Sequence, residues 1–251
     1  MPPSEQFPAG EPLGFPRCQR CPYVRVGPAR ICTECAGKAL DRIVLQACPV
    51  CSQKLADDGA CPNWLCDDPG RRIERIEAIA YLSGELRIRI HRYKYEGKTG
   101  WSLIFGRLLL GWLEANAADS RPDLIIANPA YLEPGSAGPG HVERILRSAA
   151  KEDLLETWPF DLADSPAIVK TGRTEKSAGR TAAAKRSAGH ELRVLLRIPN
   201  PERTAGRNIL VFDDVCTTGS QLNAVAACLL DQGKAATVRG LVLARAPWRG
   251  R

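Results

Sequence analysis

The stretch from Ile209 to Leu222, ILVFDDVCTTGSQL, limits the fold of this chain more than any other part. The four apolar residues Ile209–Phe212 predict a buried strand of a parallel sheet, because the run is short, continuous and partly β-branched. Two carboxylates, Asp213 and Asp214, stand where we expect this strand to end. A turn rich in hydroxyl groups follows, and then apolar residues at helical spacing. This order predicts an open α/β sheet with a ligand site beyond the carboxyl ends of its strands.

The turn has the chemistry of a phosphate site. Backbone N–H groups at the start of the following helix, together with the helix dipole, favour an anion. Gly219 allows the backbone to come close to a ligand, and the hydroxyls of Thr217, Thr218 and Ser220 can add donors. The acidic pair would repel phosphate but can accept hydrogen bonds from sugar hydroxyls. Phosphate and vicinal hydroxyls together describe a ribose 5-phosphate, and an ordinary strand–turn–helix with a capped N-terminus is the competing interpretation.

The same stretch resembles the signature of type I phosphoribosyltransferases, which bind phosphoribosyl pyrophosphate (PRPP). The resemblance implies that the acidic pair holds the 2′ and 3′ hydroxyls of the ribose and that the loop wraps the 5′-phosphate. Two positions depart from the family pattern, since Cys216 replaces an aliphatic residue and Gln221 replaces Ser or Thr. The PRPP-binding residues that the resemblance implies are Asp213, Asp214, Val215, Cys216, Thr217, Thr218, Gly219 and Ser220.

Cysteines dominate the N-terminal third of the chain. Four pairs occur between residues 18 and 66, and they are Cys18 with Cys21, Cys32 with Cys35, Cys48 with Cys51, and Cys61 with Cys66. Close pairs suit tetrahedral zinc, because each pair supplies two thiolates and two pairs complete the site. No secretory signal is apparent, which favours zinc over disulfides. We therefore expect two structural zinc ions, and a redox role for one C-x-x-C pair is the alternative.

The four cysteine pairs can be divided between the two zinc ions in two ways. In the sequential arrangement the first four cysteines bind one ion and the last four, Cys48 to Cys66, bind the other. In a cross-braced arrangement the first pair would share an ion with the third. We favour the sequential arrangement, because each half then closes as a compact unit with a short loop.

A turn signal, Asp67–Gly70, marks the expected end of the Cys-rich part. We expect a flexible Pro-rich leader over residues 1–16, a double zinc ribbon over residues 17–70 and an α/β domain over residues 71–251. No targeting signal is recognisable, and the longest apolar stretch is too short to span a bilayer. These features predict a cytoplasmic protein without a membrane partner.

Several elements of the α/β part can be placed from their patterns. The stretches Ile76–Leu82 and Asp123–Ala127 predict strands, and Trp101–Ala115 predicts a helix. The stretch 85–97 fits either a strand or a helix.

The succession of Cys pairs, a KY-x-G stretch at Lys94–Gly97 and the C-terminal PRPP motif resembles the ComF family. These are competence-type, phosphoribosyltransferase-like proteins, some of which carry double zinc ribbons. The resemblance implies a type I phosphoribosyltransferase-like fold, with an open, mainly parallel sheet flanked by helices and preceded by the zinc ribbons.

The residues after the strand at Asp123–Ala127 stand where type I transferases place the loop that binds pyrophosphate. They are Asn128, Pro129, Ala130 and Tyr131. ComF-like proteins usually carry arginines here, whereas this chain has no Arg or Lys between Arg121 and Arg144. His141 is a candidate donor, and a plain Gly/Pro loop is the alternative.

A basic segment, Lys170–Arg197, matches the flexible loop that closes over PRPP in this fold family. Its residues Lys185 and Arg186 are the candidate catalytic groups, since either could stabilise pyrophosphate as it leaves. The alternative is a solvated basic loop that touches nucleic acid.

Charge and motifs leave two functions open. The chain carries a net charge of +7, and residues 1–70 hold 7 Lys+Arg against 8 Asp+Glu, so the basic excess lies in the α/β part. The first function is a PRPP-binding phosphoribosyltransferase that uses Mg²⁺ with its substrate and transfers phosphoribosyl to a nitrogen acceptor. The second is a non-catalytic ComF-like protein that senses nucleotides or handles single-stranded DNA, alone or with a DNA-processing protein.

Overall fold

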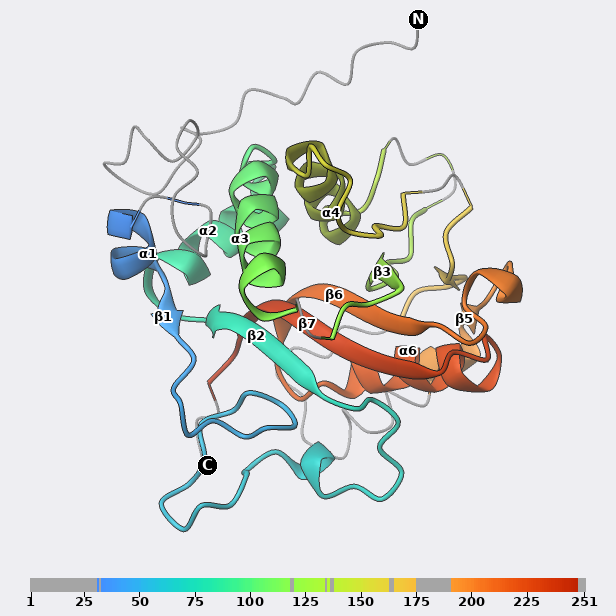
Figure 1. Ribbon diagram of the computed structural model, residues 1–251, viewed down its shortest axis with the longest axis horizontal. Helices are drawn as coiled ribbons and strands as arrows, with labels where there is room; N and C mark the ends of the chain where they lie inside the picture. The colour runs from blue at the N-terminus through green and yellow to red at the C-terminus, as the bar shows by residue number, and fades with distance from the viewer. Residues whose placement is uncertain are drawn as a thin grey trace, which may run out of the picture.

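The computed structural model describes residues 31, 33–117, 120–133, 135, 138–162, 165–174 and 191–247. Its centre is a 5-stranded sheet in the order β1-β2-β7-β6-β3 (Figure 1). The strands are Asp41–Arg42 (β1), Ile76–Tyr81 (β2), Leu124–Ala127 (β3), Asn208–Cys216 (β6) and Thr237–Arg245 (β7). Strands β2, β7, β6 and β3 run parallel, and β1 pairs antiparallel with β2. A mixed α/β chain with a mostly parallel sheet is confirmed.

Helices cover both faces of this sheet. They are Thr33–Ala39 (α1), Gly84–Tyr95 (α2), Trp101–Asn116 (α3), His141–Glu152 (α4) and Ser220–Asp231 (α6), with short 3₁₀ turns at Trp64–Cys66 (η1) and Pro201–Arg203 (η2). Helices α2, α3 and α4 lie on one face and α6 lies on the other (Figure 1). Side chains of β6 alternate between the two layers, because Leu210 and Phe212 pack with the first group whereas Ile209 and Val211 pack with α6.

The expected elements are found with small changes at their ends. Strands β2 and β3 and helix α3 occupy the stretches in which they were predicted. The ambiguous stretch is a helix, α2, whose residues Leu86, Ile90 and Tyr93 form the buried side. The prediction that β6 ends before the acidic pair is wrong. Its ladder with β7 continues to Cys216, so both carboxylates lie inside the strand.

Both edges of the sheet offer little free backbone to a further strand. At one edge β1 contributes only two exposed residues, and the start of β2 is covered by a hydrogen bond of 2.7 Å from Ile76 N to Val50 O. At the other edge, β3 receives the segment around Phe160. Ile125 N donates to Pro159 O and Asp161 N donates to Ile125 O, both at 2.8 Å.

The connections after β3 and β6 leave the sheet on opposite sides. The chain passes from β3 into α4 on one face and from β6 into α6 on the other face. Since β3 and β6 are neighbours, the two connections diverge and open a crevice at the carboxyl ends of these strands.

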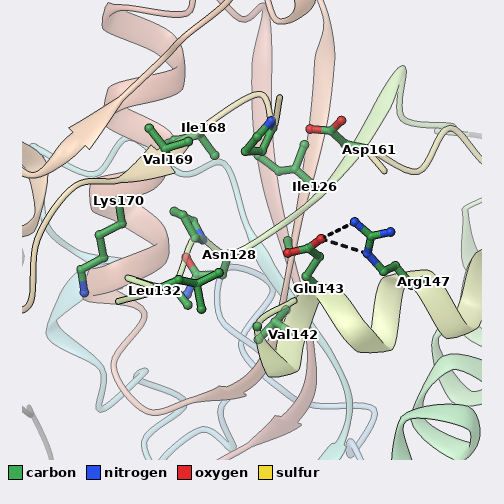
Figure 2. Close-up of a pocket in the computed structure, with 15 residues that line it drawn as sticks. Ile126, Asn128, Leu132, Val142, Glu143, Arg147, Asp161, Ile168, Val169 and Lys170 are labelled. Atoms are coloured by element: carbon green, nitrogen blue, oxygen red, sulfur yellow. Dashed lines mark hydrogen bonds and ion pairs between the residues drawn. The ribbon is translucent and has the colours of Figure 1, made fainter. Parts of the chain in front are cut away.

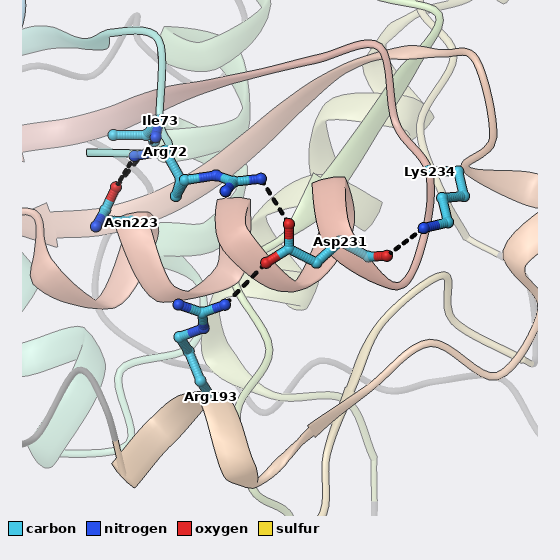
Figure 3. A network of polar contacts seen from close by, with 6 residues as sticks. All are labelled: Arg72, Ile73, Arg193, Asn223, Asp231 and Lys234. Atoms are coloured by element: carbon cyan, nitrogen blue, oxygen red, sulfur yellow. Dashed lines mark hydrogen bonds and ion pairs between the residues drawn. The ribbon is translucent and has the colours of Figure 1, made fainter. Parts of the chain in front are cut away.

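A polar network attaches neighbouring segments to the outer side of α6 (Figure 3). Asn223 Oδ1 accepts hydrogen bonds from the backbone N–H groups of Arg72 at 2.7 Å and Ile73 at 3.0 Å. Asp231 forms ion pairs with Arg72 at 2.6 Å and Arg193 at 2.8 Å. The ion pairs are partly exposed and contribute little stability, whereas Asn223 satisfies two backbone donors.

Helices α3 and α4 pack closely at Gly106. A Cβ atom at this position would lie 2.7 Å from Ala149 N and 3.0 Å from Ser148 Cβ. The glycine therefore sets the distance between the two helices, and the helical conformation itself does not require it.

This packing predicts that Gly106→Ala lowers the free energy of unfolding by about 1–3 kcal/mol, as overpacked cores do, although Ala is the better helix former. Gly37→Ala in α1 is the matched control, because a Cβ there meets no atom within 4 Å. Urea denaturation of both variants checks the prediction. Equal changes in the free energy of unfolding of the two variants would show that the packing of α3 and α4 accommodates the added methyl group without loss of stability.

Candidate ligand site and metal centre

A cavity of about 870 Å³ occupies the crevice beyond β3 and β6. It is open to solvent, and its walls come from α2, α4, β6, the start of α6 and the residues after β3 and β4. The wall residues include Lys94, Asn128, Pro129, Ala130, Tyr131, His141, Lys170, Arg173, Asp213, Asp214, Val215 and Gln221. The structure thus brings the acidic pair together with the four residues expected to form a pyrophosphate loop.

Asp214 is the most strongly engaged group of the cavity. Its carboxylate is 3% exposed, and Lys94 Nζ of α2 lies 2.9 Å from Oδ1. His141 Nε2 of α4 lies 2.9 Å from Oδ2. Burial alone would raise the pKa of Asp214, but the contact with His141 and the charge of Lys94 outweigh it and hold this pKa below its usual range.

Asp213 is in the opposite electrostatic situation. Its carboxylate has no cation in contact with it and instead accepts hydrogen bonds of 2.8 Å from Asn128 Nδ2 and from the backbone N–H of Asp214. Burial, and next the charge of Asp214, raise the pKa of Asp213 to about 7. The two adjacent carboxyl groups therefore differ in protonation, and only Asp214 is firmly ionised near neutral pH.

The loop Thr217–Ser220 lies next to this cavity without lining it. Thr217 is exposed, whereas Thr218 and Ser220 are buried and their hydroxyl oxygens lie 2.8 Å apart. These two hydroxyls therefore hydrogen-bond to each other. Gly219 adopts φ +85°, and a Cβ at this residue would come within 2.5 Å of Ile76 Cδ1. The glycine is thus required by the interior packing of the loop, a reason that the sequence did not reveal.

Two cations of the cavity belong to the basic segment Lys170–Arg197, and none comes from the residues after β3. The residues after β3 contribute the Asn128 side chain but no positive charge, and His141 contacts Asp214. Lys170 of β4 (Val169–Lys170) and Arg173 line the cavity instead. Lys170 Nζ donates to Thr174 Oγ1 at 2.7 Å, and burial lowers the pKa of this lysine. Sequence reasoning did not single out Lys170, whose place depends on a long-range strand pairing.

That pairing joins the two ends of the basic segment. Strand β4 pairs antiparallel with β5 (Leu196–Arg197), and Thr171 N donates to Leu195 O at 2.8 Å. The candidate catalytic residues Lys185 and Arg186 lie outside the described residues.

A second cavity of about 410 Å³ adjoins the first (Figure 2). The two share the walls formed by Asn128 and Lys170. On α4, Glu143 accepts hydrogen bonds from Arg147 at 2.9 and 2.7 Å, and Figure 2 shows this pair on the side away from Lys170. The crevice therefore has room for a ligand of two parts.

Four cysteines form a compact cluster below the sheet. The Sγ atoms of Cys48, Cys51, Cys61 and Cys66 all lie within 4.8 Å of one another. Cys48 and Cys66, and likewise Cys51 and Cys61, are 3.6 Å apart, and Cys61 and Cys66 are 3.5 Å apart. Zinc bonded to sulfur at about 2.3 Å in a tetrahedron separates the sulfurs by about 3.8 Å. The cluster therefore fits a closed Cys₄ zinc site, and its members are those of the second half in the sequential arrangement.

Local turns bring the cysteines of this cluster close together. Cys48 N donates to Gln53 O at 2.7 Å and Ser52 N donates to Cys48 O at 2.9 Å, which folds the first pair into a tight turn. The hydrogen bond with the Cys66 thiol lowers the pKa of Cys51 to about 4, with a contribution from the nearby charge of Arg245. A thiolate, the form that binds metal, is thus favoured at Cys51.

The other proposed zinc ligands are only partly described. Cys35 is buried on α1. Cys18, Cys21 and Cys32 lie outside the described residues, as does the expected leader over residues 1–16.

A comparison with known proteins shows a similarity over most of the chain. The chain is similar to DNA utilization protein YhgH of Escherichia coli O157:H7, with 29% identity over 224 residues that cover 86% of this chain and 90% of that protein. No protein-family model matches the chain.

Within the described residues, no helix combines the length and the apolar composition that crossing a membrane requires.

The Cys₄ geometry predicts that Cys48→Ser lowers the bound zinc by one ion per chain and lowers the free energy of unfolding, because metal binding contributes to folding. Cys228→Ser is the matched control, since Cys228 is equally buried but lies in α6 outside the cluster. Elemental analysis and urea denaturation provide the measurements. Full zinc retention in Cys48→Ser would exclude Cys48 as a ligand.

The raised pKa of Asp213 predicts a pH-dependent stability. Between its ordinary pKa near 4 and about 7, the folded protein holds a proton that the unfolded chain releases. The free energy of unfolding of the wild type should therefore fall, relative to Asp213→Asn, as the pH rises from about 5 to about 8. Denaturation of both proteins across this range measures the difference. A constant difference would contradict the assigned protonation of Asp213.

Proposed function

We propose that the crevice binds PRPP and that the chain has a type I phosphoribosyltransferase-like fold. The observation that carries this proposal is the buried acidic pair, Asp213 and Asp214, at the carboxyl end of β6. A short loop leads from it directly to the start of α6. This order places acceptors for sugar hydroxyls next to backbone donors for a phosphate.

The partners of Asp214 suit such a site. A buried carboxylate without partners would be costly, and the charge of Lys94 and the contact with His141 offset this cost. Ribose hydroxyls would then donate to the lone pairs that remain on the two carboxyl groups. Asp213, whose pKa is raised, can ionise when a hydroxyl or a cation approaches it.

The pyrophosphate of PRPP would lie toward the residues after β3. Asn128, Pro129, Ala130 and Tyr131 line this part of the cavity, and Lys170 and Arg173 supply its positive charge. Mg²⁺ would enter with PRPP and would neutralise part of the charge of the pyrophosphate. Lys185 and Arg186 are retained as the groups proposed to stabilise the departing pyrophosphate.

Catalysis, where it occurs, would transfer the phosphoribosyl group to a nitrogen acceptor. The bond from C1 to the pyrophosphate oxygen breaks, a bond from C1 to nitrogen forms, and the acceptor nitrogen loses a proton. The adjoining cavity of about 410 Å³ offers room for the acceptor. The protein would contribute positioning and charge stabilisation.

A second function is favoured by the similarity to a protein named for DNA utilization. In this alternative the chain is a non-catalytic ComF-like protein that senses nucleotides or handles single-stranded DNA, with a DNA-processing protein as a further partner. The basic excess after residue 70, with 28 Lys+Arg against 20 Asp+Glu, supports contact with a polyanion. The crevice would then hold the phosphate and sugar of a nucleotide.

The organisation of the chain belongs to the same proposal. We retain the leader over residues 1–16, the double zinc ribbon over residues 17–70 with two structural ions, and the phosphoribosyltransferase-like domain over residues 71–251. A zinc-bound thiol cluster suits a reducing compartment, which supports a cytoplasmic location.

Calorimetric titration with PRPP and Mg²⁺, with ribose 5-phosphate and with a short single-stranded oligonucleotide tests the proposal. The double variant Asp213→Asn, Asp214→Asn should weaken PRPP binding by about ten- to hundredfold, because hydrogen bonds to charged groups are lost. Its zinc content should be unchanged. Glu143→Gln is the control, since it removes a carboxylate from the adjoining cavity only.

The outcomes separate the two functions. Binding of PRPP well above that of ribose 5-phosphate supports a working pyrophosphate side and justifies a search for the acceptor. Binding of the oligonucleotide alone would favour the DNA-handling function. Unchanged PRPP affinity in the double variant would exclude the acidic pair as the ribose site.

A further inference from the structure

The Cys₄ unit, defined as residues 47–66, shares a buried boundary with the loop that follows β6. Three polar side chains cross this boundary, namely Gln53 and Asn63 from the unit and Arg245 from the end of β7. Each of them is no more than 1% exposed. Buried polar groups of this kind are expected to be engaged with specific partners.

Two of the three side chains bind carbonyl groups of the loop. Asn63 Nδ2 donates to Thr218 O at 3.0 Å. Arg245 Nη1 donates to Cys216 O at 3.0 Å and also to Thr217 O. Three successive carbonyls therefore point toward Asn63 or Arg245.

Arg245 also holds the metal cluster itself. Its Nε donates to Cys51 O at 2.8 Å, and Nη2 lies 3.6 Å from Cys51 Sγ. One guanidinium thus joins a zinc ligand to the loop, and five donors in a rigid fork allow it to do so. Asn63 stands between Cys61 and Cys66 in the sequence, so a metal bound to these cysteines also fixes the position of Asn63.

The direction of the carbonyls determines the direction of the amides. In a trans peptide the C=O of one residue and the N–H of the next point to opposite sides, and the described residues contain no cis peptide. The N–H groups of Thr217, Thr218 and Gly219 therefore point away from the side chains of Asn63 and Arg245. Among the described residues, no acceptor is recorded for these three amides. Successive free amides of this kind form an anion-binding concavity.

The loop is also pressed against the unit by its side-chain packing. A Cβ at Gly219 would lie 3.0 Å from Leu65 Cδ2 and 2.5 Å from Ile76 Cδ1. The loop therefore packs closely at Gly219 on Leu65 of the Cys₄ unit and on Ile76 of β2.

We propose that Asn63 and Arg245 are positioning residues that hold the amides of Thr217–Gly219 in the orientation that binds a phosphate. The Cys₄ unit, with zinc bound, would supply the rigid support from which they act. This inference rests on the proposed function for the identity of the ligand. In this proposal the Cys₄ unit orients the phosphate-binding amides in addition to stabilising the fold.

Asn63→Leu in the full-length zinc-loaded protein tests this inference, because Leu has nearly the shape of Asn and lacks its donor. Gln53→Leu is the matched control. Gln53 belongs to the same unit and is equally buried, but it donates to Ala246 O at 3.1 Å and not to the loop. Asn63→Asp is a second variant that keeps the acceptor for Leu65 N, in case the Leu variant does not fold.

The probes are inorganic phosphate and ribose 5-phosphate, followed by calorimetry and by the amide NMR signals of Thr217, Thr218 and Gly219. In the wild type both probes should shift these three signals. Asn63→Leu should bind either probe about tenfold more weakly, the effect of one lost orienting hydrogen bond. Its zinc content should equal that of the wild type, and Gln53→Leu should bind as the wild type does.

Equal weakening in Asn63→Leu and Gln53→Leu would overturn the inference, since general loosening of the boundary would explain it. Undiminished binding in both Asn63 variants, or wild-type binding of ribose 5-phosphate without shifts of the three amides, would also overturn it while leaving the proposed function intact. Phosphate binding without any preference for ribose 5-phosphate would contradict the proposed function and leave the inference standing. Failure of the wild type to bind either probe would contradict both the inference and the proposed function.

Discussion

The carboxylate of Asp214, buried in the central strand β6, is the constraint on which the arrangement around the crevice depends. A charge removed from water needs polar or charged partners, and here they come from two separate helices. Lys94 reaches it from α2 and His141 from α4. Tyr93 strengthens the arrangement, because its hydroxyl donates to His141 O at 2.6 Å. The positions of α2 and α4 over the end of β6, and hence the mouth of the crevice, follow from one buried charge.

Sequence patterns predicted the features that depend on neighbours in the chain. The apolar run Ile209–Phe212, the acidic pair and the tight cysteine pairs each contain their own signal, and the structure places them in a parallel sheet and a four-cysteine cluster. The end of β6 was misjudged, because a carboxylate is a poor strand residue unless distant partners neutralise it. Those partners lie outside any local pattern.

The side chains that line the crevice or support its loop are brought together by contacts between residues far apart in the sequence. Lys94 is 120 residues from Asp214, and Arg245 is 194 residues from Cys51. Lys170 enters the cavity only because β4 and β5 pair across more than twenty residues of chain. No spacing rule connects such residues, so their roles emerge only when the sheet order and the helix positions are known.

The Cys-rich segment and the sheet are separate in sequence but continuous in packing. Ile76 N at the start of β2 donates to Val50 O, and Gln53 donates to the backbone just after β7. A closed metal site usually contributes stability to its own segment. Here its support extends to β2 and β7, two neighbouring strands of the parallel part of the sheet.

The edges of the sheet restrict how this protein can associate. An open strand edge is a template for β-strand addition by a peptide or by a second copy of the chain. Strand β1 offers two residues, the start of β2 is covered by Val50, and β3 is bonded to the segment around Phe160. The described edges of the sheet therefore leave little free backbone for strand addition, which favours recognition of a partner through side chains on helices and loops.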